Sequence, residues 1–182
     1  MYPFIRAAAA LMRAKGQPKL GALEPLETTH FCMPWDLDFF LELNNGQTLT
    51  LYELNRFQLA VRTGLLSAMR RNSWGLTVAG STIQYRRRVR IFERMKMRVQ
   101  VVFWDAKFIY MEQSIHVRDV LSSHLLIRTA VTDRNGIVPV ETLMQAMATD
   151  VPPLEAPDWV ASWIEADAER PIARKRTNPE KK

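Results

Sequence analysis

The sequence predicts an α+β fold in which one long helix covers a face of an antiparallel β-sheet. Two observations favour this class. A helical repeat of apolar residues runs from Gln47 to about Arg71, and four consecutive strand-like segments follow between Leu76 and Thr132. Consecutive strands with short connections pair antiparallel, and a helix and a sheet bury their apolar faces against each other. A chain of 182 residues is long enough for one such domain.

Two elements precede the long helix: a predicted helix over residues 1–15 and a short strand over Thr29–Met33. The helix has apolar residues at helical spacing and ends at Gly16 and Pro18. We expect its apolar stripe to dock on the domain; contact with a membrane surface is the alternative. A connection punctuated by Pro and Gly, residues 17–27, leads to the strand.

The long helix is predicted from apolar residues that share one face. They are Leu51, Leu54, Phe57, Val61, Leu65 and Met69. Asn72-Ser73 ends the helix. The first of the four strands, Leu76–Ile91, contains Gly80, which indicates a bend or the close approach of another element.

The other three strands are predicted at Met97–Trp104, Phe108–Asp119 and His124–Thr132, with a turn at Asp105–Lys107 and a separation at Ser122-Ser123. Side chains alternate between the two faces of a strand. On the first of these strands, one face therefore carries Met97, Val99, Val101 and Phe103, and the other carries Arg98, Gln100, Val102 and Trp104. On the second, one face carries Ile109, Met111, Gln113, Ile115 and Val117.

The C-terminal part is predicted to hold a short helix over Pro139–Met147 and a second helix with Trp159, Trp163 and Ile164 at packing spacing. The expected organisation has four parts. These are an N-terminal helix and connection at 1–27, the main domain at 28–150, a helical appendage at 151–170 and a disordered basic tail at 171–182.

Composition excludes several classes of protein. The single cysteine, Cys32, rules out an internal disulfide, and three scattered histidines lack the spacing of metal ligands, so we expect neither a metal nor a cofactor. No apolar run approaches the length that spans a membrane. The net charge of +6 comes largely from arginines at 86–90 and from the tail. Because these are not interleaved with aromatic residues in a recognisable module, we expect a protein that binds no nucleic acid. Without a spanning run or a normal signal sequence in its N-terminal segment, we expect a cytoplasmic location.

The most informative segment is WDLDFFLELNNGQTLTLYELNR, from Trp35 to Arg56. Two acids, Asp36 and Asp38, precede the start of the long helix. An acid can activate water, and backbone N–H groups at a helix N-terminus can stabilise an oxyanion, so this pattern favours ester or thioester chemistry. The same residues are also common as caps of turns and helices.

This segment resembles the acyl thioester hydrolases of the hotdog fold. The resemblance is to the 4-hydroxybenzoyl-CoA thioesterase-like superfamily, and most closely to its thioesterase-superfamily-member (THEM-type) branch; it extends more weakly over about residues 28–149. Related acyl-carrier-protein thioesterases have the pattern Asp-x-Asp-x-Asn-x-His-x-Asn-Asn. The matching residues here are Asp36, Asp38, Phe40, Glu42, Asn44 and Asn45. Glu42 stands where a histidine is common; it can orient water but lacks a neutral donor.

The resemblance implies a set of site residues. Asp38 is the expected acid that promotes attack on the thioester carbonyl, with Glu42 beside it, while Asp36 holds the turn. The expected oxyanion donors lie at the helix entry, at Asn44, Asn45 and Gly46. Glu53 is a secondary catalytic candidate, or else pairs with Arg56 one turn on. Arg86, Arg87 and Arg88 are candidates to bind the phosphates of CoA, or else protect a strand edge from aggregation.

The leading hypothesis is an acyl-CoA thioesterase that acts as a homodimer or a dimer of dimers on an acyl-CoA or acyl-carrier-protein thioester. The acyl chain is expected in an apolar tunnel beside the central helix. The alternative is a non-catalytic hotdog protein that binds an acyl thioester, a lipid or a protein partner, because Glu42 replaces the histidine. A hotdog dehydratase ranks last, since no histidine lies in the helix-entry segment.

Overall fold

The structure, a computed structural model, describes residues 4–149 and 151–170; the predicted basic tail at 171–182 lies outside these residues. Its centre is a six-stranded antiparallel sheet with the order β1-β3-β4-β5-β2, and β6 pairs with β5. The strands are β1 Leu26–Phe31, β2 Gly75–Tyr85, β3 Arg94–Trp104, β4 Ile109–Val117, β5 Val120–Asp133 and β6 Gly136–Ile137.

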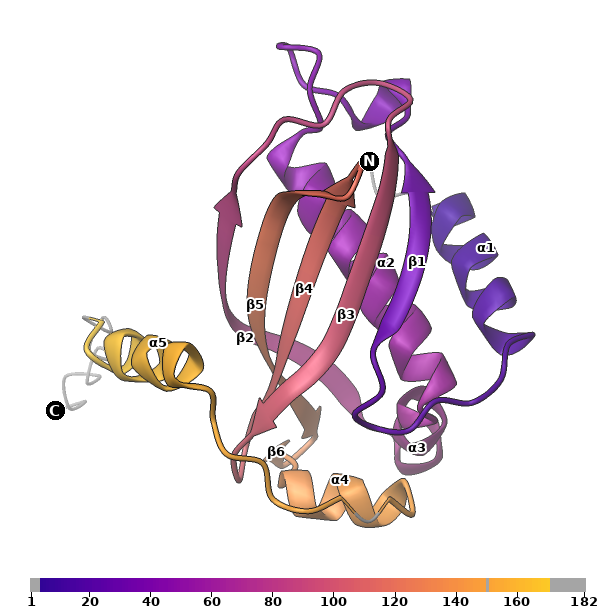
Figure 1. Cartoon of the computed structure of the whole chain (residues 1–182). Helices are drawn as coiled ribbons and strands as arrows, with labels where there is room; N and C mark the ends of the chain where they lie inside the picture. The colour runs from indigo at the N-terminus through magenta and orange to yellow at the C-terminus, as the bar shows by residue number, and fades with distance from the viewer. Residues whose placement is uncertain (1–3, 150, 171–182) are drawn as a thin grey trace, which may run out of the picture.

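One long helix, α2 (Asn45–Arg62), crosses one face of this curled sheet (Figure 1). The side chains of Leu51, Tyr52 and Leu54 on α2 are fully buried against buried residues of β3, β4 and β5. Each such side chain contributes about 1.5–3 kcal/mol through removal of apolar surface from water. The arrangement is the hotdog fold, which confirms the fold class predicted from the sequence.

The single helix predicted from Gln47 to Arg71 is two helices, which corrects the sequence-based boundary. α2 ends at Arg62, and α3 spans Leu65–Asn72. Gly64 lies between them with φ of 81°. Glycine adopts this left-handed conformation without the steric cost that other residues meet, so the chain turns here although the apolar repeat continues.

Two strand boundaries also differ from the prediction. β2 ends at Tyr85 rather than Ile91, because the backbone N–H groups of Arg86 and Arg87 bond to the carbonyl of Ser122 and a loop follows. The hairpin turn between β4 and β5 lies at Arg118-Asp119, not at Ser122-Ser123. Both turn residues have positive φ, 52° and 63°, as a two-residue hairpin of the tight primed type requires. Both serines therefore lie inside β5.

The face prediction for β3 fails at its C-terminal end. A β-bulge shifts the register with β4 between Val101 and Phe103. After the bulge, Trp104 packs in the core beneath α2, and Phe103 packs on the opposite, outer face. A bulge inserts one unpaired residue and so reverses the alternation that follows it. On β4 the predicted face is confirmed, since its five inward residues are all buried.

Helix α5 (Asp158–Ala168) covers part of the outer face, where Val160, Trp163 and Ile164 pack with the outer side chains of β4 and β5. Arg128 lies over the rings of Phe108 and Trp163, at 4.9 and 5.2 Å from the ring centroids. The predicted close approach at Gly80 is confirmed, because a Cβ there would lie 3.2 Å from the indole of Trp163.

Two further helices complete the fold: α1 (Phe4–Lys15) packs beside α2, and α4 (Val140–Ala146) lies at the lower end of the sheet in Figure 1. The short helix η1 (Pro34–Asp36) joins β1 to the loop before α2. Arg6 of α1 forms a two-pronged salt bridge with the buried Asp36, with both N···O distances 3.0 Å. None of the helices in the described residues has the length and apolarity needed to cross a membrane.

Candidate active site

The N-terminus of α2 is capped by the side chain of Asn44. Its Oδ1 accepts hydrogen bonds from the backbone N–H groups of Gly46 (2.7 Å) and Gln47 (3.3 Å). The donor of Gly46 is therefore engaged within the chain. Among the described residues, the N–H of Asn45 meets no acceptor. Of the three predicted oxyanion donors, Asn45 is thus the one whose backbone is free to meet a ligand.

The loop before α2 is built around Asp38. One carboxylate oxygen, Oδ1, accepts from the backbone N–H groups of Phe40 (2.8 Å) and Glu42 (3.3 Å). The backbone of Asp38 also exchanges bonds with Glu42 and Leu41. The second oxygen, Oδ2, receives no hydrogen bond from the residues that the structure describes. Asp38 therefore shapes a tight loop and keeps one oxygen available to hold water.

Asp36 has a structural position, in line with its predicted role in the turn. It is 1% exposed, accepts from the N–H of Met33 (2.9 Å) and binds Arg6. Its carbonyl accepts from the N–H of Asn44 (2.8 Å), which fixes the start of α2. A carboxylate with all these partners, enclosed by protein, has no room for substrate.

Glu42 joins the loop before α2 to the loop after β2. Its carboxylate forms an ion pair with Arg88, Oε1 to Nη1, at 2.9 Å. The backbones also meet, through a bridge between Glu42 and Arg90 and through the N–H of Leu43, which donates to the carbonyl of Val89 (2.9 Å). The loop before α2 is therefore held against the arginine segment, far away in the sequence.

A hollow of about 220 Å³ opens where these two loops meet the N-terminus of α2; we name it the entry hollow. Its lining consists of Glu42, Leu43, Asn45, Thr48, Tyr85, Arg86, Arg87, Arg88, Val89, Ser122 and Ser123. The structure thus brings together Glu42, Asn45 and the three arginines. Asn44 and Gly46 lie next to the hollow as parts of the cap, Asp38 lies in the loop behind Glu42, and Glu53 lies outside the lining.

Each of the three arginines has a partner inside the protein. Arg86 donates to Gln84 (3.0 Å), Arg87 to the carbonyl of Val117 (3.1 Å) and to Glu93 (3.3 Å), and Arg88 binds Glu42. Arg86 and Arg88 are nevertheless exposed. They present further N–H groups, which suit bidentate binding of a phosphate.

Sequence reasoning missed the polar residues that β2 and β5 bring to the hollow. Ser122 accepts from the backbone of the arginine segment, and its hydroxyl donates to the carbonyl of Arg87 (2.8 Å). Ser123 bonds to the hydroxyl of Tyr52 at 2.8 Å, and burial raises the pKa of Tyr52. Burial also raises the pKa of Tyr85. The serine pair resembles a turn in the sequence, and no local signal indicates that it faces a cavity.

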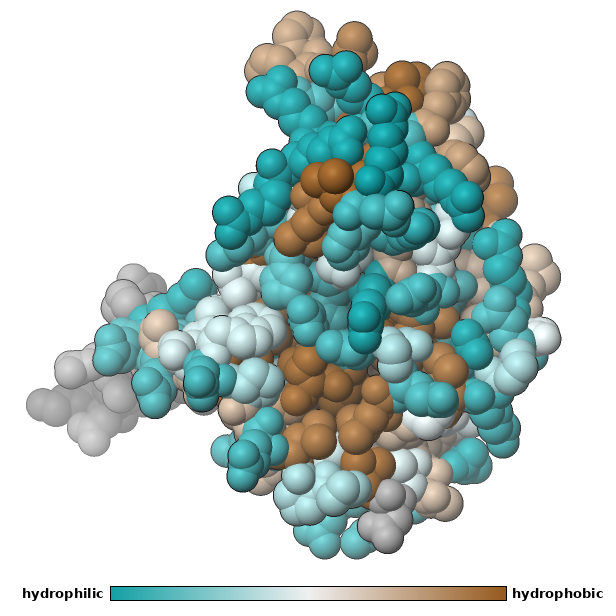
Figure 2. Space-filling view, in the orientation of Figure 1, coloured by the Kyte–Doolittle hydropathy of each residue, from teal (hydrophilic) through white to brown (hydrophobic). Residues whose placement is uncertain are grey.

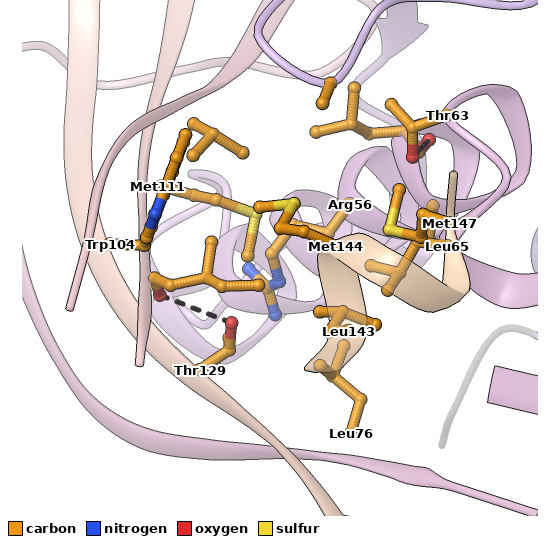
Figure 3. A pocket seen from close by; sticks show the side chains of 15 residues that line it. Arg56, Thr63, Leu65, Leu76, Trp104, Met111, Thr129, Leu143, Met144 and Met147 are labelled. Carbon is orange, nitrogen blue, oxygen red and sulfur yellow. Dashed lines mark hydrogen bonds between the residues drawn. The ribbon is translucent and has the colours of Figure 1, made fainter. Parts of the chain in front are cut away.

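A second, apolar cavity of about 50 Å³ lies near the other end of α2, between the helix, the sheet and α4 (Figure 3). Its lining includes Leu59, Leu65, Trp104, Met111, Leu143, Met144 and Met147, and we name it the methionine cavity. Arg56 also lines it, and its Nη1 donates to Gln113 Oε1 at 2.7 Å. This cavity and the entry hollow share no lining residue, and Leu51 and Tyr52, which lie between the two linings along α2, are fully buried.

The single cysteine is not suited to nucleophilic catalysis. Cys32 is fully buried, and burial raises the pKa of its thiol to about 11, so the thiol form dominates near neutral pH. Among the described residues, no three His, Cys, Asp or Glu side chains come together as a metal site. The polar groups that line the entry hollow come from Glu42, Asn45, Thr48, Tyr85, the three arginines and the two serines.

Fold and hollow define a hotdog protein with a polar site at the start of its central helix. Residues 32–164 match the family described as the Thioesterase-like superfamily. The chain is 32% identical over 164 residues to Protein THEM6 of Xenopus laevis, a match that covers 88% of this chain and 78% of the relative. The chain therefore belongs to the Thioesterase-like superfamily.

Solved structures are similar in fold. YbaW, a probable thioesterase of Escherichia coli, superimposes with a TM-score of 0.63 at 18% identity, covering 67% of this chain and 96% of YbaW. A hypothetical protein of Staphylococcus aureus in complex with CoA has a TM-score of 0.60 at 11% identity, covering 85% of this chain and 98% of that protein.

Proposed function

We propose that the protein is a thioester hydrolase that acts on an acyl group carried by CoA or by an acyl-carrier protein. The observation that carries this proposal is the entry hollow, which is lined by Glu42, by Asn45 and by the exposed Arg86 and Arg88, next to the loop that holds Asp38. Membership of the Thioesterase-like superfamily supports thioester hydrolysis as the general activity. The S. aureus protein with a similar fold was solved in complex with CoA.

In the proposed reaction, the thioester carbonyl accepts a hydrogen bond from the N–H of Asn45. The positive end of the α2 dipole adds to the stabilisation of the oxyanion. Asp38 Oδ2 takes a proton from water as the water attacks, and the thiolate of the carrier leaves. Glu42 orients the water and holds Arg88, while Arg86 and Arg88 bind the phosphates of the carrier. No metal or cofactor enters this mechanism; CoA is part of the substrate.

We further propose that the working form is a homodimer that pairs along β2. This strand is an edge of the sheet, and its second side has no partner among the described residues. Val78 and Tyr85 are exposed on it. A strand edge of eleven residues is a ready template for pairing with another chain. Light scattering coupled to gel filtration tests this, and a monomer at all concentrations contradicts it.

The test of catalysis is a panel of short, long and aromatic acyl-CoAs with detection of free thiol. Asp38→Asn is expected to lower kcat by at least about a hundredfold, because a general base contributes about 10²–10⁴. Glu42→Gln is expected to cost less, about tenfold, since the amide still orients water. Glu53→Gln is the control, because Glu53 neither lines the hollow nor belongs to the loop, next to the hollow, that holds Asp38 and Glu42. Full activity of Asp38→Asn, or loss of activity in Glu53→Gln, contradicts the mechanism.

A non-catalytic binding protein is the second candidate. It is favoured by the ion pair that occupies Glu42 and by the cap that occupies the N–H of Gly46. Isothermal titration with a non-hydrolysable acyl-CoA thioether distinguishes the two. Tight binding without turnover of any matching thioester establishes the binding protein; turnover that Asp38→Asn abolishes removes it.

A further inference from the structure

Two adjoining loops expose a cluster of large apolar side chains, which we name the apolar tip. Its members are Trp35, Phe39, Phe40, Leu41, Ile91 and Phe92. Phe39 is 94% exposed and Phe40 is 77% exposed. In Figure 2 tan and brown residues gather at the top of the molecule, where these loops lie in Figure 1. Single exposed apolar residues are normal on a protein surface, but a cluster marks an interaction site.

The two loops form one supported surface. The N–H of Phe92 donates to the carbonyl of Cys32 (2.7 Å), and the N–H of Cys32 donates to the carbonyl of Glu93 (3.1 Å). Asp38 closes the other loop through its bonds to Phe40 and Glu42. These bonds fix the backbone that presents the apolar side chains outward.

Backbone strain indicates that these side chains serve a contact. Leu41 and Phe92 have φ of 58° and 61°, in the left-handed region. This conformation is uncommon for large apolar residues and suits glycine or asparagine better. A glycine or a polar residue at these two positions would avoid both the backbone strain and the exposure of apolar surface to water. The presence of Leu41 and Phe92 therefore favours a partner that covers them.

Positive charge surrounds the apolar tip. Arg90, Arg94 and Arg118 are exposed, and Arg94 and Arg118 line a hollow of about 430 Å³ together with Ile91, Phe92 and Lys96. Four of the acids nearby form ion pairs: Glu42 with Arg88, Glu93 with Arg87 and Arg118, Asp119 with Lys96 and Asp36 with Arg6. Asp38 accepts hydrogen bonds from backbone N–H groups of its own loop. Arg90 and Arg94 form no ion pair among the described residues. The arginines around the apolar tip therefore favour an anionic partner.

We propose that the apolar tip binds the surface of an anionic lipid bilayer. The aromatic side chains enter the headgroup region, and the arginines meet lipid phosphates. A two-fold contact between two tips brings arginine against arginine, so charge complementarity favours lipid over a second copy of the chain. Where the proposed thioesterase function holds, docking also places the entry hollow next to the bilayer, because both are built from the same loops.

Co-sedimentation of the purified chain with vesicles tests the proposal without any assay of turnover. The probes are vesicles of phosphatidylcholine alone and of phosphatidylcholine mixed with phosphatidylglycerol. We expect binding to the mixed vesicles that weakens in high salt, and at least about tenfold weaker binding to phosphatidylcholine alone, since each basic residue near an anionic surface contributes about a fivefold factor.

Two paired variants separate the apolar and the electrostatic parts. Phe39→Ser with Phe40→Ser, and Arg90→Glu with Arg94→Glu, are each expected to weaken binding at least about tenfold. Ile137→Ser and Arg134→Glu are the matched controls, because both residues are exposed in the turn region of β6, outside the tip, and should leave binding unchanged. Unchanged thermal melting shows that the variants are folded.

Three results overturn the proposal. One is equal binding to neutral and anionic vesicles, and another is wild-type binding by the Phe39→Ser, Phe40→Ser variant. The third is a tip variant that dissociates an oligomer of the wild type while neither form binds vesicles, which assigns the tip to contact between subunits. Vesicle binding is measured without substrate, so its result is independent of whether the proposed thioesterase function holds.

Discussion

The two ends of the central helix lie in opposite surroundings. At the start of α2, charged and polar side chains from three segments line the entry hollow, which is open to solvent. Towards its end, the methionine cavity is apolar and closed by α4. The same helix therefore supports a site that exchanges ligand with water at one end and a packed core at the other. Substitutions near the closed end should act on stability, and those at the open end on ligand binding and turnover.

The largest effect is expected at the closed end. Leu143 on α4 is 1% exposed and lines the methionine cavity, so Leu143→Ala enlarges this cavity. We expect a loss of about 3–4 kcal/mol in the free energy of unfolding, measured by urea denaturation. Leu49→Ala is the control at the open end; because Leu49 is exposed, its loss should cost less than about 0.5 kcal/mol. Equal losses would contradict the contrast between the two ends.

Acid should weaken the protein through His30, on β1 beside the loop that leads to α2. Burial, and then Arg6 and Arg13 of α1, lower the pKa of His30 to about 4, against the opposing effect of Asp36. In the unfolded chain the pKa is about 6.5. Between these values the unfolded state binds more protons, so stability is complete above pH 6.5 and falls as the pH drops towards 4, by up to about 3 kcal/mol.

The measurement is the free energy of unfolding of wild type and His30→Leu across this pH range. The variant should lose a clear part of the slope, while the remaining slope reports the other titrating groups of the protein. A slope that is identical in the two proteins would show that His30 does not take up the proton.

A smaller effect is expected at the cap of the open end. Asn44→Ala removes the acceptor of Gly46 and Gln47 and should cost about 1 kcal/mol of stability. Asn44→Asp keeps an acceptor and is the matched control. Because the substitution frees the N–H of Gly46, affinity for an acyl-CoA thioether reports whether this donor competes with Asn45 for ligand. Unchanged unfolding of Asn44→Ala would show that the cap contributes nothing.

The smallest effect on stability is expected for Arg88→Gln. The Arg88 side chain is 77% exposed, so its ion pair with Glu42 should contribute less than about 0.5 kcal/mol. The same change should raise KM for an acyl-CoA, with a smaller effect on an acyl-pantetheine that lacks the nucleotide phosphates. Equal changes of KM for both substrates would argue that Arg88 acts through Glu42 rather than through phosphate.

The sequence predicted the elements and their order because apolar periodicity reports which residues are buried. It failed where a local backbone conformation decides the outcome. Gly64 ends α2 within an unbroken apolar repeat, and the turn at Arg118-Asp119 places an arginine, a residue with no turn preference, at positive φ. The site was predictable in part for a similar reason. The motif identified Glu42 and Asn45, but Ser122 and Ser123 reach the entry hollow only through pairing of β5 with β2.

The bulge after Val101 has a consequence for the C-terminal helix. A strand at the surface of a domain normally has one apolar and one polar face along its whole length. In β3 the two faces are exchanged after the bulge. The C-terminal end of β3 presents Phe103 on the outer face, beside Val102 and the outward-facing Tyr110 of β4. This part of the outer face is therefore apolar, and it is covered by Val160, Trp163 and Ile164 of α5. The single inserted residue thus gives α5 a role in shielding the apolar outer face of the sheet from water.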